Sequence, residues 1–324
     1  MSSAMEWQVP QTVQPKPEDY GFDLDRALAS VVSVRTRVAD DAFTADILGT
    51  ERSGNGVLIR PDGLVLTIGY LVTEAETIWL GLSDGRTVPG DVIGFDQQTG
   101  FGLVRALARL SVPSLPLGDS SSAGFGDPVI VAGAGGRQRS VAAQVVARQE
   151  FAGYWEYVLD EALFTAPAHP FWGGTGLIGG DGRLLGIGSL RLDQASATSG
   201  GQINMMVPVD LLKPILDDLL ATGSRRGPAR PWLGLYAVEA EDGIVVAGLA
   251  RKGPAERSGL KTSDAVLAVG GEEIDGLADF FRKIWALGPA GVPVPVTVRR
   301  DDEVLDMTVA SADRNDFLKA PRLH

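Results

Sequence analysis

The sequence predicts a mostly β protein of two domains. Strand-like runs recur about every 8–12 residues without helices between them, a spacing typical of β-sandwiches and barrels and not of parallel βαβ sheets. Glycine supplies 41 of the 324 residues, which favours short strands joined by tight turns over a helical bundle. The pattern changes after a basic, proline- and glycine-rich linker at 224–230, where strands and helices mix. A chain of this length has room for about two domains.

Residues 1–22 form a polar, proline-rich N-terminal arm. Its Tyr20 and Phe22 are expected to dock on the body of the protein or on another subunit, unless the arm is simply disordered. The first domain spans 23–223, with strands expected at 31–34, 57–59, 64–67, 77–80, 87–94, 102–104, 128–132, 141–147, 157–159, 184–190 and 202–207. One helix is expected from Pro208 to Thr222, because its leucines and isoleucine share one face and Gly223 follows as a C-cap.

The second domain, 231–312, is predicted to be a small α+β module, and 313–324 a polar C-terminal tail. Helices are expected at Pro254–Ser258 and at Gly276–Leu287. Strands are expected at 233–238, 243–249, 265–269, 294–299 and 304–309.

Composition excludes several classes of function. The formal net charge of -12 argues against nucleic acid as a partner, because phosphate binding needs a basic surface. The chain has no cysteine, so disulfides and thiolate chemistry are absent, and no motif indicates a cofactor or a metal. We see no signal peptide and no apolar run of the roughly 20 residues that a membrane span needs. The expected location is cytoplasmic, or periplasmic if the N-terminus is processed or incomplete.

Several segments, in the right order, resemble the HtrA/Deg family of bacterial trypsin-like serine proteases. They are Gly54–Ile59 with Asp62–Thr67, Gly94–Thr99, Gly126–Gly133, Thr165–Ile187 and Asn204–Val209. Two further runs, Lys252–Leu260 and Asp264–Ile274, resemble a PDZ domain, with Ser263 in place of the usual glycine. The resemblance covers about residues 25–310. It implies a chymotrypsin-like double β-barrel followed by a PDZ domain, and an oligomer, plausibly a trimer held by the arm.

The same resemblance places non-catalytic residues at all three triad positions. A serine protease needs a hydroxyl nucleophile, an imidazole that takes its proton and a carboxylate that orients the imidazole. The matching positions hold Gly173, Tyr70 and Gly100. A phenol, with a reference pKa of about 10, is a poor general base at neutral pH. We therefore predict that the barrel is not an enzyme.

Substitutes for these groups are scarce. The chain has only two histidines, His324 at its last position and His169, four residues before Gly173. Thr175 is a nearby hydroxyl, but no sequence signal places an Asp or Lys to activate it. In the family, the backbone N–H groups matching Gly173 and Phe171 form an oxyanion hole, which is one reading of this loop. The alternative, which we favour, is that Phe171 and Trp172 fill the former cleft.

In the PDZ-like domain, the resemblance implies a peptide-binding groove. The backbone N–H groups of the loop Trp232, Leu233, Gly234 and Leu235 would receive a peptide C-terminus, and the strand after it would pair with the peptide. Phe280, Phe281 and Ile284 of the second helix either line the side-chain pocket or belong to the core of the domain.

The sequence thus predicts a noncatalytic pseudoprotease that binds protein or peptide C-termini, with the barrel as scaffold. Two alternatives remain. One is an active endopeptidase with an unrecognised nucleophile, and the other is a structural oligomer whose PDZ groove is closed.

Overall fold

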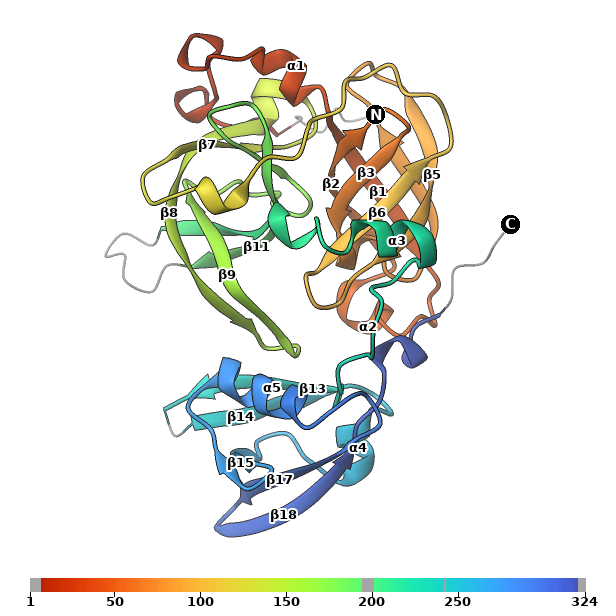
Figure 1. The fold of residues 1–324 in the computed structure, drawn as a ribbon, viewed down its shortest axis with the longest axis vertical. Helices are drawn as coiled ribbons and strands as arrows, with labels where there is room; N and C mark the ends of the chain where they lie inside the picture. Colours follow the sequence, from red (N-terminus) through yellow and green to blue (C-terminus); the bar gives the residue numbers. More distant parts are fainter. Residues whose placement is uncertain (1–6, 194–200, 242, 320–324) are drawn as a thin grey trace. The chain divides into compact units, whose positions relative to one another are not determined.

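The computed structural model describes residues 7–193, 201–241 and 243–319, which cluster into two compact units (Figure 1). Unit 1 comprises the described residues up to 149, residues 161–225 and Lys319. Unit 2 comprises residues 150–160 and 226–318. The first six residues of the predicted arm, and residues 320–324 of the predicted tail with His324, lie outside the described part of the chain.

Unit 1 contains two closed antiparallel barrels of six strands each, which confirms the predicted double β-barrel. Barrel 1 has the strand order β1-β2-β3-β6-β5-β4, with bounds Val31–Val38, Glu51–Arg60, Leu64–Ile68, Phe101–Ala106, Thr87–Phe95 and Ala75–Gly81. Barrel 2 has the order β10-β11-β12-β9-β8-β7, with bounds Gly176–Ile178, Leu184–Asp193, Gln202–Pro208, Tyr157–Ala166, Ser140–Gly153 and Pro128–Ala132. Each interior is filled by the alternating apolar side chains that a pleated strand turns to one face, such as Val34, Leu66 and Leu103 in barrel 1.

The predicted helix from Pro208 to Thr222 is wrong as a single element. The chain instead forms a short 3-10 turn, η6 (Val209–Leu211), and then α3 (Leu216–Thr222), which ends at Gly223 in the left-handed conformation. The physical reason is Pro214, which has no N–H to donate and whose ring clashes with the preceding turn. Two short helices that the sequence did not predict, α1 (Leu24–Leu28) and α2 (Ala45–Leu48), flank β1.

The described part of the arm docks on the chain's own second barrel. Val9 is 2% exposed and belongs to the buried cluster of barrel 2, and its N–H donates to the Gln138 carbonyl over 2.8 Å. Trp7 packs edge-on against Phe171, with 4.8 Å between ring centroids. The 3-10 turns η1 (Gln11–Val13) and η2 (Pro17–Asp19) follow along the arm. The described part of the arm therefore packs on the body of its own chain. The trimer that the resemblance implies stays a prediction.

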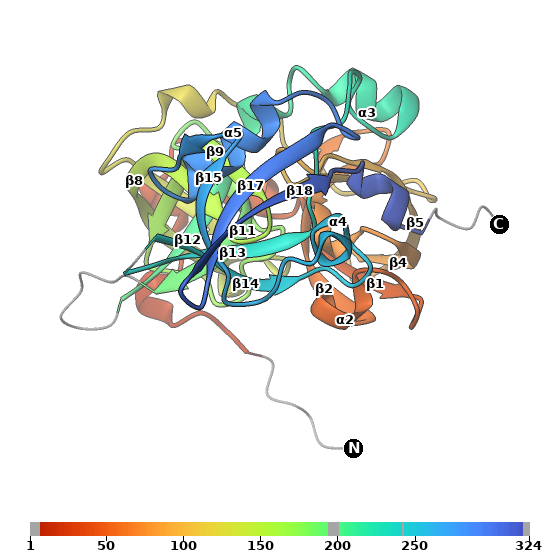
Figure 2. The same ribbon diagram turned by 90° about the horizontal axis from the view of Figure 1, so that it is seen from below.

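Unit 2 has a sheet in the order β13-β14-β15-β17-β18 together with α-helices, which confirms the predicted small α+β module (Figure 2). The strands are Leu235–Ala240, Gly243–Leu249, Ala265–Val269, Pro293–Arg300 and Glu303–Ala310, with β16 (Glu272–Glu273) paired to β15. Helices α4 (Pro254–Ser258) and α5 (Leu277–Ala286) complete it, and the 3-10 turn η7 (Arg314–Phe317) gives structure to the predicted tail. Phe280, Phe281 and Ile284 of α5 are fully buried in its core.

The hairpin of β8 and β9 contributes residues to both units. The two strands leave barrel 2 and are much longer than the expected runs at 141–147 and 157–159. The prediction assigned 150–160 to the barrel domain, whereas this hairpin tip clusters with unit 2. Tyr154, Trp155 and Tyr157 pack their rings against one another at the tip.

Candidate functional site

Tyr70 and Gly173 meet in the cleft between the two barrels. Tyr70 lies in the 3-10 turn η3 (Gly69–Leu71) after β3, and Gly173 lies in the loop between β9 and β10. A Cβ atom placed on Gly173 would lie 2.6 Å from the Tyr70 hydroxyl oxygen, which is closer than real side chains approach. That hydroxyl donates to the Ser189 carbonyl over 3.1 Å, and burial raises the pKa of the phenol above its ordinary value. The space beside Gly173 is therefore filled by a neutral phenol.

Gly100 lies next to the same turn. Its carbonyl accepts a hydrogen bond of 2.6 Å from the Gly69 N–H, and its own N–H closes a turn onto the Asp96 carbonyl over 2.8 Å. With φ at +81° it has the left-handed conformation that disfavours a side chain. The nearby Asp96 carboxylate accepts from Thr99 and is paired with Arg225. The predicted triad positions are thus connected, Tyr70 to Gly173 directly and Gly100 to the turn that carries Tyr70 through Gly69.

Asn55 of β2 fixes the backbone of the loop that contains Gly173. Its backbone N–H and its side-chain amide donate to the Gly173 carbonyl over 2.8 Å and 3.1 Å, and the amide also reaches the Phe171 carbonyl over 3.1 Å. On its other side, the Asn55 side-chain oxygen accepts from the Ala134 N–H over 2.9 Å. The loop is therefore held by one residue of barrel 1 through its carbonyl groups.

The predicted oxyanion hole of Phe171 and Gly173 lacks one of its two donors in this structure. The Phe171 N–H donates to His169 Nδ1 over 3.1 Å, so this N–H is already used. With Nδ1 accepting, the imidazole proton lies on Nε2, which donates to the Arg139 carbonyl over 2.8 Å. Burial lowers the pKa of His169, which keeps the ring neutral. The other prediction, that Phe171 fills the former cleft, is also wrong, because this side chain is 55% exposed.

Thr175 is not poised as a substitute nucleophile. Its side chain is completely buried, and its hydroxyl donates to the Trp172 carbonyl over 2.8 Å. His169, the only described imidazole, has both ring nitrogens engaged with backbone groups, so neither is directed at this hydroxyl. A hydroxyl without a base to take its proton is a weak nucleophile.

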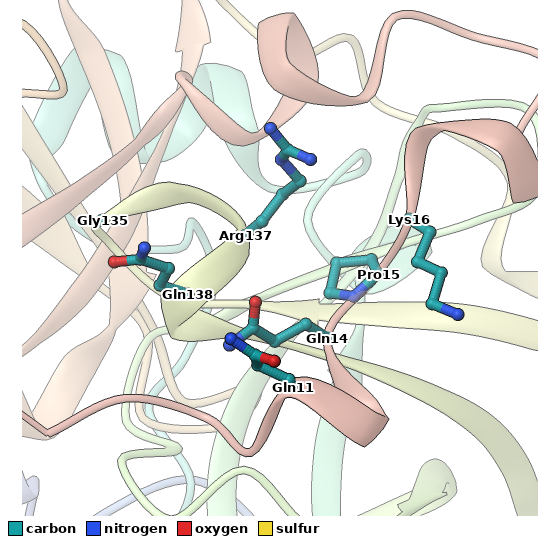
Figure 3. Close-up of a pocket in the computed structure, with 7 residues that line it drawn as sticks. All are labelled: Gln11, Gln14, Pro15, Lys16, Gly135, Arg137 and Gln138. Atoms are coloured by element: carbon teal, nitrogen blue, oxygen red, sulfur yellow. The ribbon is translucent and has the colours of Figure 1, made fainter.

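A hollow of about 400 Å³ remains open beside this cleft. Its lining includes Tyr70, Phe171, Trp172 and Gly173 together with Arg35 and Arg139. A second hollow, of about 510 Å³, lies between the arm and the loop joining β7 to β8 (Figure 3). It is lined by three glutamines, Lys16 and Arg137, with Pro15 and Gly135, and Arg137 pairs with Asp25. This lining contains no carboxylate, imidazole or hydroxyl side chain.

The predicted carboxylate loop of unit 2 holds a carboxylate. Glu156, at the hairpin tip, accepts hydrogen bonds from the backbone N–H groups of Leu233, Gly234 and Leu235. The distances to its Oε1 atom are 3.2 Å, 2.7 Å and 3.1 Å, respectively. Such a converging set of N–H groups is a built anion site. The loop thus has the geometry to receive a carboxylate, and in the folded chain that carboxylate is its own.

Two further contacts join the hairpin tip to unit 2, one through the backbone and one through an apolar side chain. The carbonyl of Tyr154 accepts from the Ala237 N–H on β13 over 2.9 Å, so the tip pairs with the strand that follows the loop. Val158 is 8% exposed and belongs to the same buried cluster as Phe281 and Ile284. Trp232 does not share the role predicted for it, because its N–H donates to the Ala312 carbonyl over 3.0 Å. Glu156 was not among the residues predicted for this site.

Docking of Glu156 should depend on pH. Burial raises the pKa of its carboxyl from an ordinary 4.5 to about 7, although the three N–H groups and the nearby Arg314 favour the charged form. Because the docked group holds its proton more tightly than the free group, docking is strongest below about pH 4.5 and weakens as the pH rises to about 7. We expect a loss of about 1–3 kcal/mol across this window, discounted for relaxation around the buried group. Trp155 fluorescence against pH should show it, and a flat profile identical to that of Glu156→Gln would contradict it.

Comparison with known families supports both units. Residues 54–187 match the model of the trypsin-like peptidase domain, and residues 231–310 match that of the PDZ domain. A probable periplasmic serine endoprotease, DegP-like, from Halomonas elongata is 28% identical over 82% of the chain. The chain spans only 57% of that relative's length. The serine endoprotease DegS from Salmonella typhimurium is 25% identical, with 93% of this chain and 88% of the relative covered.

Solved structures show the same fold. The HtrA-type protease AlgW with a decapeptide superposes with a TM-score of 0.53 at 22% identity, over 92% of this chain and 98% of that one. The serine endoprotease from Yersinia pestis gives 0.53 at 20% identity, over 90% and 98% of the two chains. In the described part of the chain, no helix is both long and apolar enough to span a membrane. The cytoplasmic location predicted from the sequence finds no support in relatives whose names describe them as periplasmic.

Proposed function

We propose that this chain, which belongs to the HtrA/Deg family, is a noncatalytic member that binds the C-termini of proteins through its PDZ domain. The barrel unit then serves as a scaffold. The observation that carries the first half is the contact between Tyr70 and Gly173, where the phenol takes the space that a nucleophile's Cβ atom would need.

The chemistry of the cleft supports the absence of peptidase activity. Loss of one triad member already costs a serine protease orders of magnitude in rate, and oxyanion stabilisation alone leaves only a small remainder. Here the three positions hold Tyr70, Gly100 and Gly173, and one of the two expected oxyanion donors, the Phe171 N–H, is bonded to His169. No group in this arrangement both activates and delivers a nucleophile.

The N–H groups of Leu233, Gly234 and Leu235 support the binding half of the proposal. They all donate to one carboxylate oxygen. A free peptide C-terminus has the same kind of acceptor group. A solved relative, the HtrA-type protease AlgW, carries a decapeptide. By contrast, the bound Glu156 favours a second candidate, a structural protein whose PDZ groove is permanently closed by its own hairpin.

Binding and hydrolysis can be tested on one sample of the purified chain. We expect fluorescein-labelled decapeptides with a free carboxylate at an apolar last residue to bind, and their C-terminally amidated counterparts to bind at least about tenfold more weakly, since the loop loses a charged acceptor. Casein incubated with the same sample should stay intact. Equal binding of acid and amide would contradict C-terminal recognition, and casein fragments would contradict the noncatalytic proposal.

A further inference from the structure

We infer that the hairpin tip, residues 150–160, is an internal ligand of the PDZ groove and that an incoming protein C-terminus opens the groove by displacing Glu156. This inference rests on the proposed function, because it assigns a regulatory step to the same peptide-binding site. The tip occupies at once the three features that a bound peptide would use: the carboxylate loop, the neighbouring strand and the apolar cluster.

The carboxylate of Glu156 occupies the charged end of the site. Its Oε1 atom accepts from all three loop N–H groups, and its Oε2 atom accepts from Leu233 over 3.0 Å. A peptide carboxylate cannot reach the same donors while Glu156 is bound to them. The competition is therefore for the same atoms and not merely for nearby space.

The backbone and the apolar contact complete the resemblance to a bound peptide. The Tyr154 carbonyl, two residues before Glu156, pairs with the Ala237 N–H as a strand added to β13 would. Val158, two residues after Glu156, is buried in the cluster that contains Phe280, Phe281 and Ile284. Because the tip fills the apolar cluster with a small branched side chain, the partner we expect is a protein C-terminus whose last residue is apolar.

Several features keep this docking displaceable. Glu156 has φ at +61°, a left-handed conformation that is strained for a residue with a Cβ atom. Arg282 of α5 pairs with Glu150 and Asp160 on either side of the tip, but all three side chains are well exposed, and such pairs contribute little. Burial also opposes the charged form of Glu156. A peptide that brings an unstrained terminal carboxylate and a longer strand can therefore compete.

The test compares peptide affinity of the full chain with and without the internal carboxylate. The probes are fluorescein-labelled decapeptides ending in free Val, Leu, Phe or Ala. In Glu156→Gly, which also suits the positive φ, we expect at least about tenfold tighter binding than in the unaltered chain, because the apparent affinity scales with the fraction of open groove. The control is Glu161→Gln, which removes a carboxylate from the same hairpin that contacts Arg148 instead of the loop, and it should bind like the unaltered chain.

The outcomes separate this inference from the proposed function. Equal affinity of the unaltered chain and Glu156→Gly would overturn the internal-ligand inference and leave the proposed function standing. No binding by any variant, with circular dichroism and thermal midpoints unchanged, would overturn the proposed function itself. Binding by Glu156→Gly alone would show that Glu156 closes the groove, but it would overturn displacement by these C-termini and favour the second candidate, the permanently closed groove. As a second measurement, peptide binding should raise hydrogen exchange in the hairpin tip, residues 150–160, which loses its partners in the groove. The amides of Leu235 and Ala237 should stay protected, because they bond to the peptide instead of Glu156 and Tyr154. Unchanged exchange in the tip would count against displacement.

Discussion

Replacing Gly174 by alanine will destabilise the barrel unit by at least about 4 kcal/mol, a large part of the roughly 5–15 kcal/mol by which folded domains are stable. A Cβ atom at this position would lie 1.8 Å from the Asn55 carbonyl oxygen and 2.7 Å from the Thr67 hydroxyl. The backbone also has φ at +75°, where an L-residue is strained. Since Asn55 belongs to β2 and Thr67 to β3, relief would require the loop and barrel 1 to separate. Urea unfolding followed by tryptophan fluorescence measures the change.

The matched control for this prediction is Gly180→Ala, in the turn that joins β10 to β11. No heavy atom lies within 4 Å of a Cβ atom placed there, so the expected change is within about 0.5 kcal/mol. Equal effects of the two substitutions would mean that the contact between the Gly173–Gly174 loop and barrel 1 is not as described.

The second large effect is a coupling between Gly173 and Tyr70. Gly173→Ala should cost about 1–3 kcal/mol, because the new methyl group overlaps the Tyr70 hydroxyl. In Tyr70→Phe the same substitution should cost less than about 0.5 kcal/mol, since the nearest ring atom, Cζ, would then lie 3.5 Å away in ordinary contact. The double-mutant cycle measured by urea unfolding should therefore give a coupling free energy of about 0.5–3 kcal/mol, the difference between the two costs.

Additive effects would contradict the geometry that carries the noncatalytic proposal. A side chain at position 173 would then fit beside the phenol, and the loop could present a hydroxyl group to the cleft. The cycle also bears on any attempt to restore activity. Gly173→Ser alone should leave the protein inactive, because serine has the same Cβ atom as alanine and no base stands beside it.

The alternation of apolar residues and the turn signals predicted a mostly β first domain and a small α+β second domain. The two barrels and the PDZ unit were predicted by the resemblance to the HtrA/Deg family. The helix α4 has the predicted bounds, Pro254–Ser258, because proline at its first position and Gly259 just after its last mark both ends. The helix from 208 to 222 was overextended, because its apolar periodicity continues across Pro214. The sequence therefore predicted helix bounds correctly where proline and glycine mark both ends of the helix, as in α4.

The sequence predicted the residues of the cleft in the barrel unit but not the carboxylate in the PDZ groove. Tyr70, Gly100 and Gly173 could be placed because the family resemblance fixed their registers, and they do lie together. Glu156 could not be placed, since its partners Leu233, Gly234 and Leu235 follow it by 77–79 residues and nothing local indicates that contact. The one available signal was the aromatic run around it, which is unusual for a solvent-exposed turn and is here the tip of the long hairpin.

A covalent probe tests the central claim, that the barrel has no peptidase activity, most directly. The full chain and Thr175→Ala would be incubated with a fluorophosphonate, beside an active serine protease as a positive control, and their intact masses measured. We predict no adduct on either form, because the Thr175 hydroxyl is buried and no base faces it. A stoichiometric adduct on the unaltered chain that disappears in Thr175→Ala would contradict the account and identify the nucleophile.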